Sequence, residues 1–260
     1  MRRLLFAVYG SLAFLLFVAT WAYFVGFLSG IGVPKSIDSG PATGRLAAVA
    51  WDVGLLAIFF AHHSVMARSG AKRLLTKAIP PVVERATYVL VASLALDLVL
   101  WQWRPLPGVV WHVQGHARVV VLVGFWGGVV VALVAAFTID GFDLFGLRQV
   151  LIDFRGRAPS RMAFVTPGLY RLVRHPLMTG ILLSLWSVPL MSAGRLLLAT
   201  TMSAYIILAV KLLEERDLRK AFGAEYARYE REVPMIVPWK GARRDASEPG
   251  AVDGHPAPPR

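Results

Sequence analysis

Long apolar runs dominate the hydrophobic pattern of this sequence. A run of about 18 or more apolar residues is long enough to cross a bilayer as a helix. The predicted spans are residues 4–28, 46–66, 87–103, 119–138, 177–191 and 196–213. The fifth is short and contains Pro189, so it is either a span or half of a tight helical hairpin. The pattern predicts an all-α, polytopic integral membrane bundle of five to six transmembrane helices.

Composition supports this membrane assignment. The chain is 56% hydrophobic and only 17% charged, which is too apolar for an ordinary soluble domain. The run 4–28 is uncharged and longer than the apolar core of a cleaved secretory signal, so we expect it to be a retained helix. The absence of cysteine excludes disulfides, thiolate metal sites and a cysteine nucleophile. We predict no metal site.

The basic residues predict the orientation in the membrane. With the N-terminus inside, 23 of the 28 Lys and Arg residues fall in cytoplasmic segments, as positively charged inner loops require. This accounts for the net charge of +12 without nucleic acid, for which the sequence carries no recognition motif. We therefore expect a protein of the bacterial inner (cytoplasmic) membrane with both termini cytoplasmic.

The last two spans organise the C-terminal part. Their predicted connection, residues 192–195, is so short that the two helices must be antiparallel, with residues 169–176 and 214–217 meeting at the cytoplasmic face. We predict an N-terminal transmembrane region at 1–138, a catalytic region at 139–240 containing the hairpin 177–213, and a disordered tail at 241–260. The tail is rich in Pro, Gly, Ala and charge and cannot bury a core.

The residues at this junction are suited to one ligand that carries both an anionic and a cationic group. Pro176 is favoured in the first turn of a helix, whose free N–H groups attract a carboxylate. Arg174 or His175 can add a charge-assisted bond. Glu214 and Glu215, expected at the C-terminal end of the facing helix, need partners such as an ammonium or ribose hydroxyls. They can equally pair with nearby arginines in an ion network.

Aromatic residues follow these carboxylates at helical spacing. Leu218, Phe222, Tyr226 and Tyr229 are separated by steps of 4, 4 and 3 and predict one helical face. This face is suited to covering an adenine or a sulfonium group. The alternative is that it lies in the membrane interface, where Tyr residues accumulate.

The combination of Arg174-His175-Pro176, Gly180, the paired glutamates and Phe222-Gly-x-x-Tyr226-x-x-Tyr229 resembles the isoprenylcysteine carboxyl methyltransferase and phospholipid methyltransferase superfamily over roughly residues 165–238. The resemblance implies a pocket for S-adenosyl-L-methionine. The cofactor-binding residues that it implies are Tyr170, Leu172, Val173, Arg174, His175, Pro176, Gly180, Glu214, Glu215, Tyr226 and Tyr229.

The N-terminal part carries a second resemblance. The segments His62-His63-Ser64-Val65-Met66-Ala67-Arg68, Glu84-Arg85-Ala-Thr-Tyr88 and 138–149 look like the methanethiol S-methyltransferases, and together with the C-terminal part the match extends to about Trp239. The paired histidines and the Glu-Arg pair are also similar to the NnrU group of bacterial membrane proteins. The resemblance implies methylation of methanethiol to dimethyl sulfide.

A thiol attacks as its thiolate, so such a site needs a base or an environment that favours the anion. Polar residues at membrane depth are expensive and point to function. The catalytic candidates, all expected at the level of the cofactor pocket, are His62, His63, Asp140, Asp143 and Arg148. They can also form a network that ties helices together. The adjacent histidines point about 100° apart on a helix, so one of them faces the pocket.

Two other functions stay open at this stage. One keeps the methyl donor and takes a lipid or isoprenylcysteine as acceptor. The other is a non-catalytic membrane protein of the NnrU type in nitrogen-oxide metabolism. A soluble dinucleotide-fold methyltransferase is not supported, because the sequence has no acidic-x-Gly-x-Gly-x-Gly signature.

Overall fold

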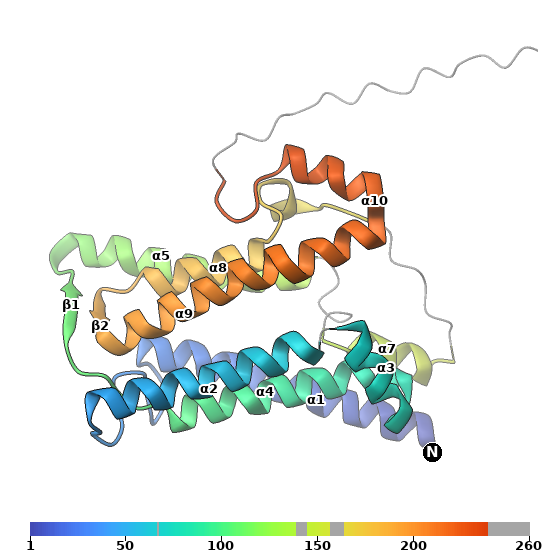
Figure 1. Ribbon diagram of the computed structural model, residues 1–260, viewed down its shortest axis with the longest axis horizontal. Helices are drawn as coiled ribbons and strands as arrows, with labels where there is room; N and C mark the ends of the chain where they lie inside the picture. The colour runs from blue at the N-terminus through green and yellow to red at the C-terminus, as the bar shows by residue number, and fades with distance from the viewer. Residues whose placement is uncertain (67, 139–144, 157–163, 239–260) are drawn as a thin grey trace, which may run out of the picture.

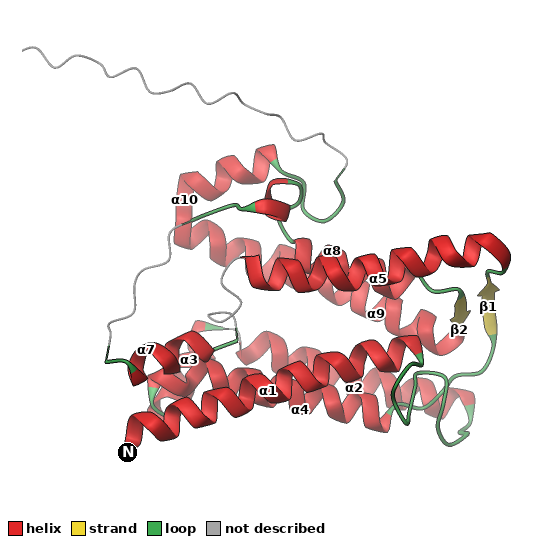
Figure 2. Ribbon diagram, turned by 180° about the vertical axis from the view of Figure 1, so that it is seen from behind, coloured by secondary structure: helices red, strands yellow, loops and turns green. Residues whose placement is uncertain are grey.

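Long helices lie side by side in two layers in the computed structural model, which describes residues 1–66, 68–138, 145–156 and 164–238. One layer contains α1, α2 and α4, and the other contains α5, α8 and α9 (Figures 1 and 2). The elements in chain order are α1 (Arg2–Ser29), α2 (Arg45–Met66), α3 (Ser69–Ala78), η1 (Pro81–Val83), α4 (Glu84–Gln102), β1 (Val109–His112), α5 (Gly115–Thr138), α7 (Leu147–Phe154), η2 (Gly168–Arg171), α8 (Pro176–Trp186), β2 (Leu190–Ser192), α9 (Ala193–Ala209), η3 (Val210–Glu214) and α10 (Glu215–Glu232).

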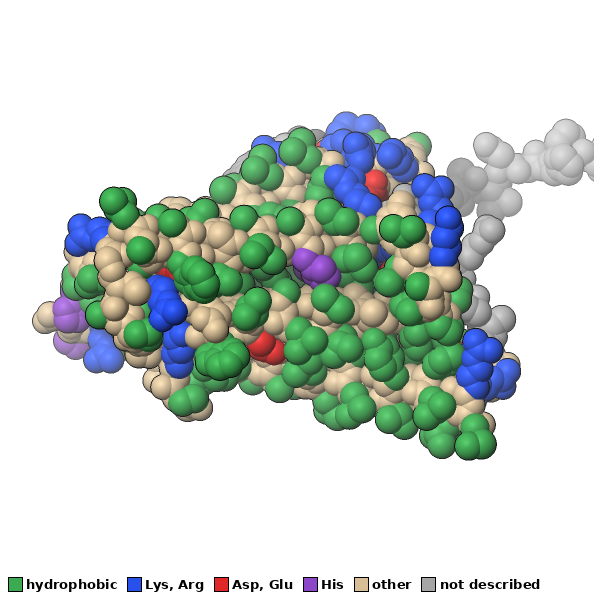
Figure 3. Space-filling model, turned by 60° about the horizontal axis from the view of Figure 1, so that its bottom comes forward, with side chains coloured by type: hydrophobic (Ala, Val, Ile, Leu, Met, Phe, Trp, Pro, Cys, Tyr) green, Lys and Arg blue, Asp and Glu red, His purple; other side chains and the backbone are tan. Residues whose placement is uncertain are grey.

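Four helical segments are long and apolar enough to cross a membrane: Arg2–Ser29, Arg45–Met66, Gly115–Thr138 and Ala193–Glu232, the last of which is kinked at Gly223. Figure 3 shows hydrophobic side chains over the middle of one face, with Lys and Arg gathered toward its two ends. The chain is therefore an integral membrane protein. The expected count of five to six spans is only partly met, because α8 has just 11 residues and α4 carries three charged residues.

The two ends of the bundle differ. The N-terminus, α3, α7 and α10 lie at one end, and β1 and β2 lie at the other (Figure 1). We call these the α10 end and the ribbon end. At the ribbon end the two strands pair antiparallel, with Trp111 opposite Met191.

The last two long helices end differently from the prediction. Helix α8 stops at Trp186, and residues 190–192 form β2, so the connection is 187–192 rather than 192–195. Helix α9 does not end near residue 213. It continues through the π-helical turn η3 into α10, so Glu214 and Glu215 lie within a continuous helix rather than at a helix C-terminus. Alternating apolar residues over three or four positions are too short a signal to predict such a strand pair.

Helices α5 and α8 approach each other closely at glycines. A Cβ on Gly180 would lie 2.5 Å from the Ala132 nitrogen, and one on Gly128 would lie 2.5 Å from Ser184 Oγ. Small residues allow transmembrane helices to pack at this distance. This contact fixes α8, and the segment preceding it, against α5.

Polar residues near the ribbon end are paired within the bundle. The Arg104 backbone N–H donates to Asp52 at 2.9 Å, and Arg195 Nε donates to Asp38 at 2.7 Å. Deeper in the bundle, Thr20 donates to Asp97 at 2.9 Å. These contacts give Asp38, Asp52 and Asp97 structural partners away from the α10 end.

Candidate functional site

Two buried ionic residues, Arg174 and Glu215, form the centre of a cluster at the α10 end. Arg174 donates from Nε and Nη2 to one oxygen of Glu215, at 2.9 and 2.6 Å. Arg174 Nη1 donates to the carbonyl oxygens of Glu230 and Val233, at 2.9 and 2.5 Å. Side-chain exposure is only 9% for Arg174 and 4% for Glu215. Charge-assisted bonds of this kind therefore fix the loop before α8 to both ends of α10.

His175 lies between the two predicted glutamates. Its Nε2 is 3.3 Å from Glu215 and its Nδ1 is 3.4 Å from Glu214. Burial alone lowers the pKa of His175, but the hydrogen bonds and negative charges of Glu214 and Glu215 outweigh it and raise that pKa to about 9. His175 is therefore an imidazolium at neutral pH, and both carboxylates bind a cation.

The backbone holds this cluster in place. The N–H groups of Arg174 and His175 donate to the carbonyls of Pro234 and Met235, at 2.8 and 3.0 Å. Thr179 Oγ1 donates to the Ile236 carbonyl at 2.7 Å. Pro176 occupies the first turn of α8, as the sequence predicts. The chain after α10 thus folds back along the start of α8.

The residues predicted to form one helical face do not share a straight helix, because α10 is kinked at Gly223, between Phe222 and Tyr226. Tyr226 and Tyr229 are buried, and the ring of Phe164 lies against both, with centroid distances of 6.0 and 5.4 Å. Tyr229 donates to the Tyr170 carbonyl at 2.5 Å. The Tyr226 hydroxyl is buried and has no hydrogen-bond partner among the described residues. An orphaned buried hydroxyl beside an ionic cluster is suited to a polar ligand.

A second polar cluster joins α2, α4 and α9. The Tyr88 hydroxyl lies 3.0 Å from Nδ1 of His63, and Ser64 Oγ lies 3.1 Å from the Tyr205 hydroxyl. The ring of His62 lies 6.4 Å from that of Tyr88. Tyr88 and Tyr205 were not among the predicted site residues. Polar groups inside apolar spans were the signal that could have identified them.

Glu214 lies beside the first cluster and within electrostatic range of the second. Its side chain is 47% exposed, and it lies within electrostatic range of His63 and Tyr88 as well as beside His175. Its charge also reaches Tyr170, where burial first and then Glu214 raise the pKa to about 12. The two groups of predicted site residues therefore lie at the same end of the bundle.

The remaining predicted residues are placed differently. Leu172 is exposed, whereas Val173 is buried. Gly180 lies in the α5–α8 contact, so helix packing accounts for this glycine. Arg148 lies in α7, which packs against α1. Asp140 and Asp143 lie outside the described residues, so the structure says nothing of their position.

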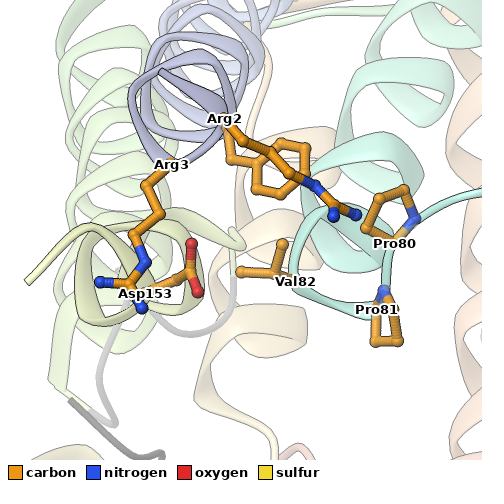
Figure 4. Close-up of a pocket in the computed structure, with 7 residues that line it drawn as sticks. Arg2, Arg3, Pro80, Pro81, Val82 and Asp153 are labelled. Carbon is orange, nitrogen blue, oxygen red and sulfur yellow. The ribbon is translucent and has the colours of Figure 1, made fainter. Parts of the chain in front are cut away.

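A separate cavity of about 440 Å³ also lies at the α10 end. It is formed by the start of α1, the segment 80–82 and α7, and Figure 4 shows Arg2, Arg3 and Asp153 around it. It contains none of the predicted site residues. We place the candidate site at the two polar clusters because their ionisable and hydroxyl side chains can bind a polar ligand and transfer protons.

Comparisons with known proteins identify relatives of the chain. The NnrU protein family matches residues 53–241, which include both polar clusters. The methanethiol S-methyltransferase of Mycobacterium tuberculosis is 44% identical over 92% of this chain and 98% of its own length. Methanethiol S-methyltransferase 2 of Bradyrhizobium diazoefficiens is 45% identical over 93% of each chain. Nurim of Sus scrofa is 35% identical over 72% of this chain and 78% of its own length. No solved structure matches the chain significantly.

Proposed function

The chain belongs to the NnrU protein family, and we propose that it is a membrane-bound methyltransferase that transfers a methyl group from S-adenosylmethionine to methanethiol, forming dimethyl sulfide. The relatives named methanethiol S-methyltransferase cover nearly the whole chain at 44–45% identity. The observation that carries the proposal is Glu214, a half-exposed carboxylate beside His175 and within electrostatic range of His63.

The residues of the ionic cluster fit the methyl donor. The donor combines a carboxylate, an ammonium and a ribose, and the site offers cations, a half-exposed carboxylate and the orphaned hydroxyl of Tyr226. We propose that Glu214 and Tyr226 bind polar groups of the donor and that Tyr229 and Tyr170 line the site. When bound, S-adenosylmethionine supplies an electrophilic methyl group on a positively charged sulfur.

Glu215 has a different role from Glu214 in this proposal. Its carboxylate already binds Arg174 and His175, so it orients these two cations instead of taking a ligand. His175 then carries positive charge at the start of α8, where helix N–H groups also favour an anion. The donor's carboxylate is the group that this arrangement suits.

The thiol side of the site is proposed to lie at the second cluster. His62 and His63 remain the candidates for accepting the thiol proton among the described residues, and Asp140, Asp143 and Arg148 remain predictions. Methanethiol is small and apolar, so it can reach the site through the bilayer.

We also propose that α4 and the segment 176–192, in which α8 continues into β2, cross the membrane with the four long segments, which gives six crossings. Helix α4 has 19 residues and packs on α1 and α2, and α8 packs along α5. In this arrangement the α10 end is cytoplasmic, both termini are inside, and the chain resides in the bacterial inner membrane.

The test is headspace gas chromatography of cells that express the chain and are fed methanethiol, beside a vector control. We expect dimethyl sulfide above the control, and at least tenfold less from a Glu214→Ala variant, since a lost charged contact is worth about 1.5–3 kcal/mol. The matched control is Glu232→Gln, which removes an exposed carboxylate paired with Arg228 at 2.9 Å.

No dimethyl sulfide from a membrane-inserted protein that binds S-adenosylmethionine would contradict the thiol acceptor. Methylation of a lipid extract by that protein would instead support the lipid alternative. If the purified protein binds no S-adenosylmethionine, the methyltransferase proposal itself fails.

A further inference from the structure

Two polar pairs connect α2 to its neighbours near the C-terminal end of α2. His63 contacts Tyr88 of α4, with the hydroxyl 3.0 Å from Nδ1 and 3.2 Å from Nε2. Ser64 contacts Tyr205 of α9 at 3.1 Å. Helix α2 lies between α4 and α9 (Figure 1). Burying such groups in an apolar bundle is costly unless they are paired, so a function is the first hypothesis for them.

The contacts distinguish the two adjacent histidines. The His63 ring is held among aromatic rings, with Phe59 at 5.7 Å, Tyr88 at 5.5 Å and Tyr205 at 6.3 Å. His62 has a buried Nδ1 without a hydrogen-bond partner among the described residues. His63 is therefore the histidine whose orientation is fixed by a neighbouring hydroxyl.

A hydroxyl bonded to an imidazole also determines its proton arrangement. A neutral imidazole has one N–H donor and one acceptor nitrogen, and the partner of one nitrogen sets the state of the other. The single Tyr88 hydroxyl is within reach of either nitrogen but can donate its one proton only once. When the Tyr88 hydroxyl oxygen instead accepts from the N–H of one ring nitrogen, the other ring nitrogen of His63 is the one that can accept a proton.

We propose that Tyr88 is a positioning residue for thiol deprotonation, holding the His63 ring so that His63 accepts the proton of the methyl acceptor. The inference rests on the proposed function and adds a residue to it. The thiol proton passes to His63, and the thiol sulfur forms a bond to the donor methyl carbon. The bond between that carbon and the donor sulfonium breaks, and its electron pair stays on the donor sulfur.

The charges around His63 act on this proton transfer in opposite directions, since Arg85 opposes a positively charged ring and Glu214 favours it. The titratable and charged groups that face it are His62, Tyr88 and Arg85, Tyr205, and Glu214. Glu214 supplies the negative charge that stabilises the imidazolium as it forms. The same carboxylate lies beside the proposed donor site, which places the accepted proton near an exposed group from which it can leave.

The experiment compares Tyr88→Phe with the wild-type protein by the rate of dimethyl sulfide formation from methanethiol between about pH 6 and pH 9. General-base catalysis contributes about 10²–10⁴-fold, and we expect His63→Gln to lose about 100-fold and Tyr88→Phe about tenfold at the acidic end. The deficit should narrow as pH rises, because more thiolate then exists in solution. S-adenosylmethionine affinity, measured by calorimetry, should stay within about twofold of wild type.

The matched control is Tyr9→Phe. It removes a tyrosine hydroxyl that bonds Thr87, the residue before Tyr88, at 2.9 Å. We expect its rate to match the wild type at every pH.

Wild-type rates in Tyr88→Phe, or a loss by one constant factor at every pH, would overturn the positioning role, and so would a loss of donor affinity. If Tyr88→Phe does not accumulate in the membrane, the same pH comparison is made with His63→Gln. Wild-type rates in His63→Gln would overturn the inference, because Tyr88 would then have no base to position. A wild-type protein that forms no dimethyl sulfide refutes the proposed function instead, and the inference then falls with it.

Discussion

At the scale of single residues, the structure separates two glutamates that are adjacent in sequence. Successive residues on a helix point about 100° apart, so Glu214 and Glu215 face different surroundings. Glu215 is buried and held by Arg174, His175 and, at 3.7 Å, Arg219. Glu214 is half-exposed, and among the described residues its ion-pair partner is His175. Glu215 therefore stabilises the structure of the candidate site, and Glu214 is available to a ligand.

The raised pKa of His175 predicts a pH-dependent stability. Its pKa is about 9 in the folded protein against about 6.5 unfolded. The stabilisation is fully present below about pH 6.5 and is lost as pH rises through 9, with a size on the order of 3 kcal/mol. Thermal unfolding of the purified protein in detergent should show the apparent Tm falling across this window.

In His175→Gln this fall should be absent or much smaller. His112→Gln is the matched control, because His112 is an exposed histidine at the ribbon end. A His175→Gln variant with the wild-type slope between these pH values would show that the imidazolium does not stabilise the fold.

At the scale of elements, the α5–α8 contact positions the site. The loop that carries Arg174 and His175 leads directly into α8, and α8 is fixed on α5 by backbone approach at Gly180 and Gly128. The resemblance implied Gly180 as a cofactor residue, and the structure gives this glycine a packing reason. No pattern in one sequence reveals which helix faces a given glycine.

Gly180→Ala should therefore destabilise the bundle. Its Cβ would lie 2.5 Å from backbone atoms of Ala132 and Gly128, which cannot rotate away. Overpacking of this kind costs about 1–3 kcal/mol. The apparent Tm and the yield of folded protein measure the effect.

Gly127→Ala is the matched control, since nothing lies within 4 Å of its Cβ position. Alanine is favoured over glycine in a helix interior by roughly 0.5–1 kcal/mol, so this variant should be as stable as wild type or slightly more. Equal stability of both variants would show that α5 and α8 are farther apart than in the structure.

At the scale of the whole molecule, the bundle has two distinct ends. The N-terminus, α3, α7 and α10 share one end with both polar clusters, and the short ribbon lies at the other (Figure 1). The basic residues of the N-terminus, α3 and α10 thus gather where positively charged cytoplasmic segments are expected. The fold places the proposed chemistry at one membrane face.

The lack of cysteine makes the orientation directly testable. Gln114→Cys introduces a thiol at the exposed ribbon end, and Lys220→Cys introduces one in α10, where Lys220 is 67% exposed. A membrane-impermeant maleimide should label only the Gln114→Cys variant in intact spheroplasts and both variants after permeabilisation. Labelling of Lys220→Cys in intact spheroplasts would contradict a cytoplasmic α10 end.

The sequence by itself determined the properties that depend on local pattern and residue type. Apolar runs identified the long helices, and Pro176 identified the start of α8, because length, hydropathy and proline geometry are local constraints. The same reasoning selected Arg174, His175 and the glutamates as candidate site residues.

Only the tertiary structure decided which of these residues stabilise the fold and which are available to a ligand. It joined α9 through η3 to the first part of α10, which is kinked at Gly223, paired β1 with β2, and brought Tyr88 to His63 across two helices. Such contacts depend on which helix faces pack together, and the free energy of that packing comes from segments that are far apart in the sequence. A single sequence records the composition of each face but not its partner.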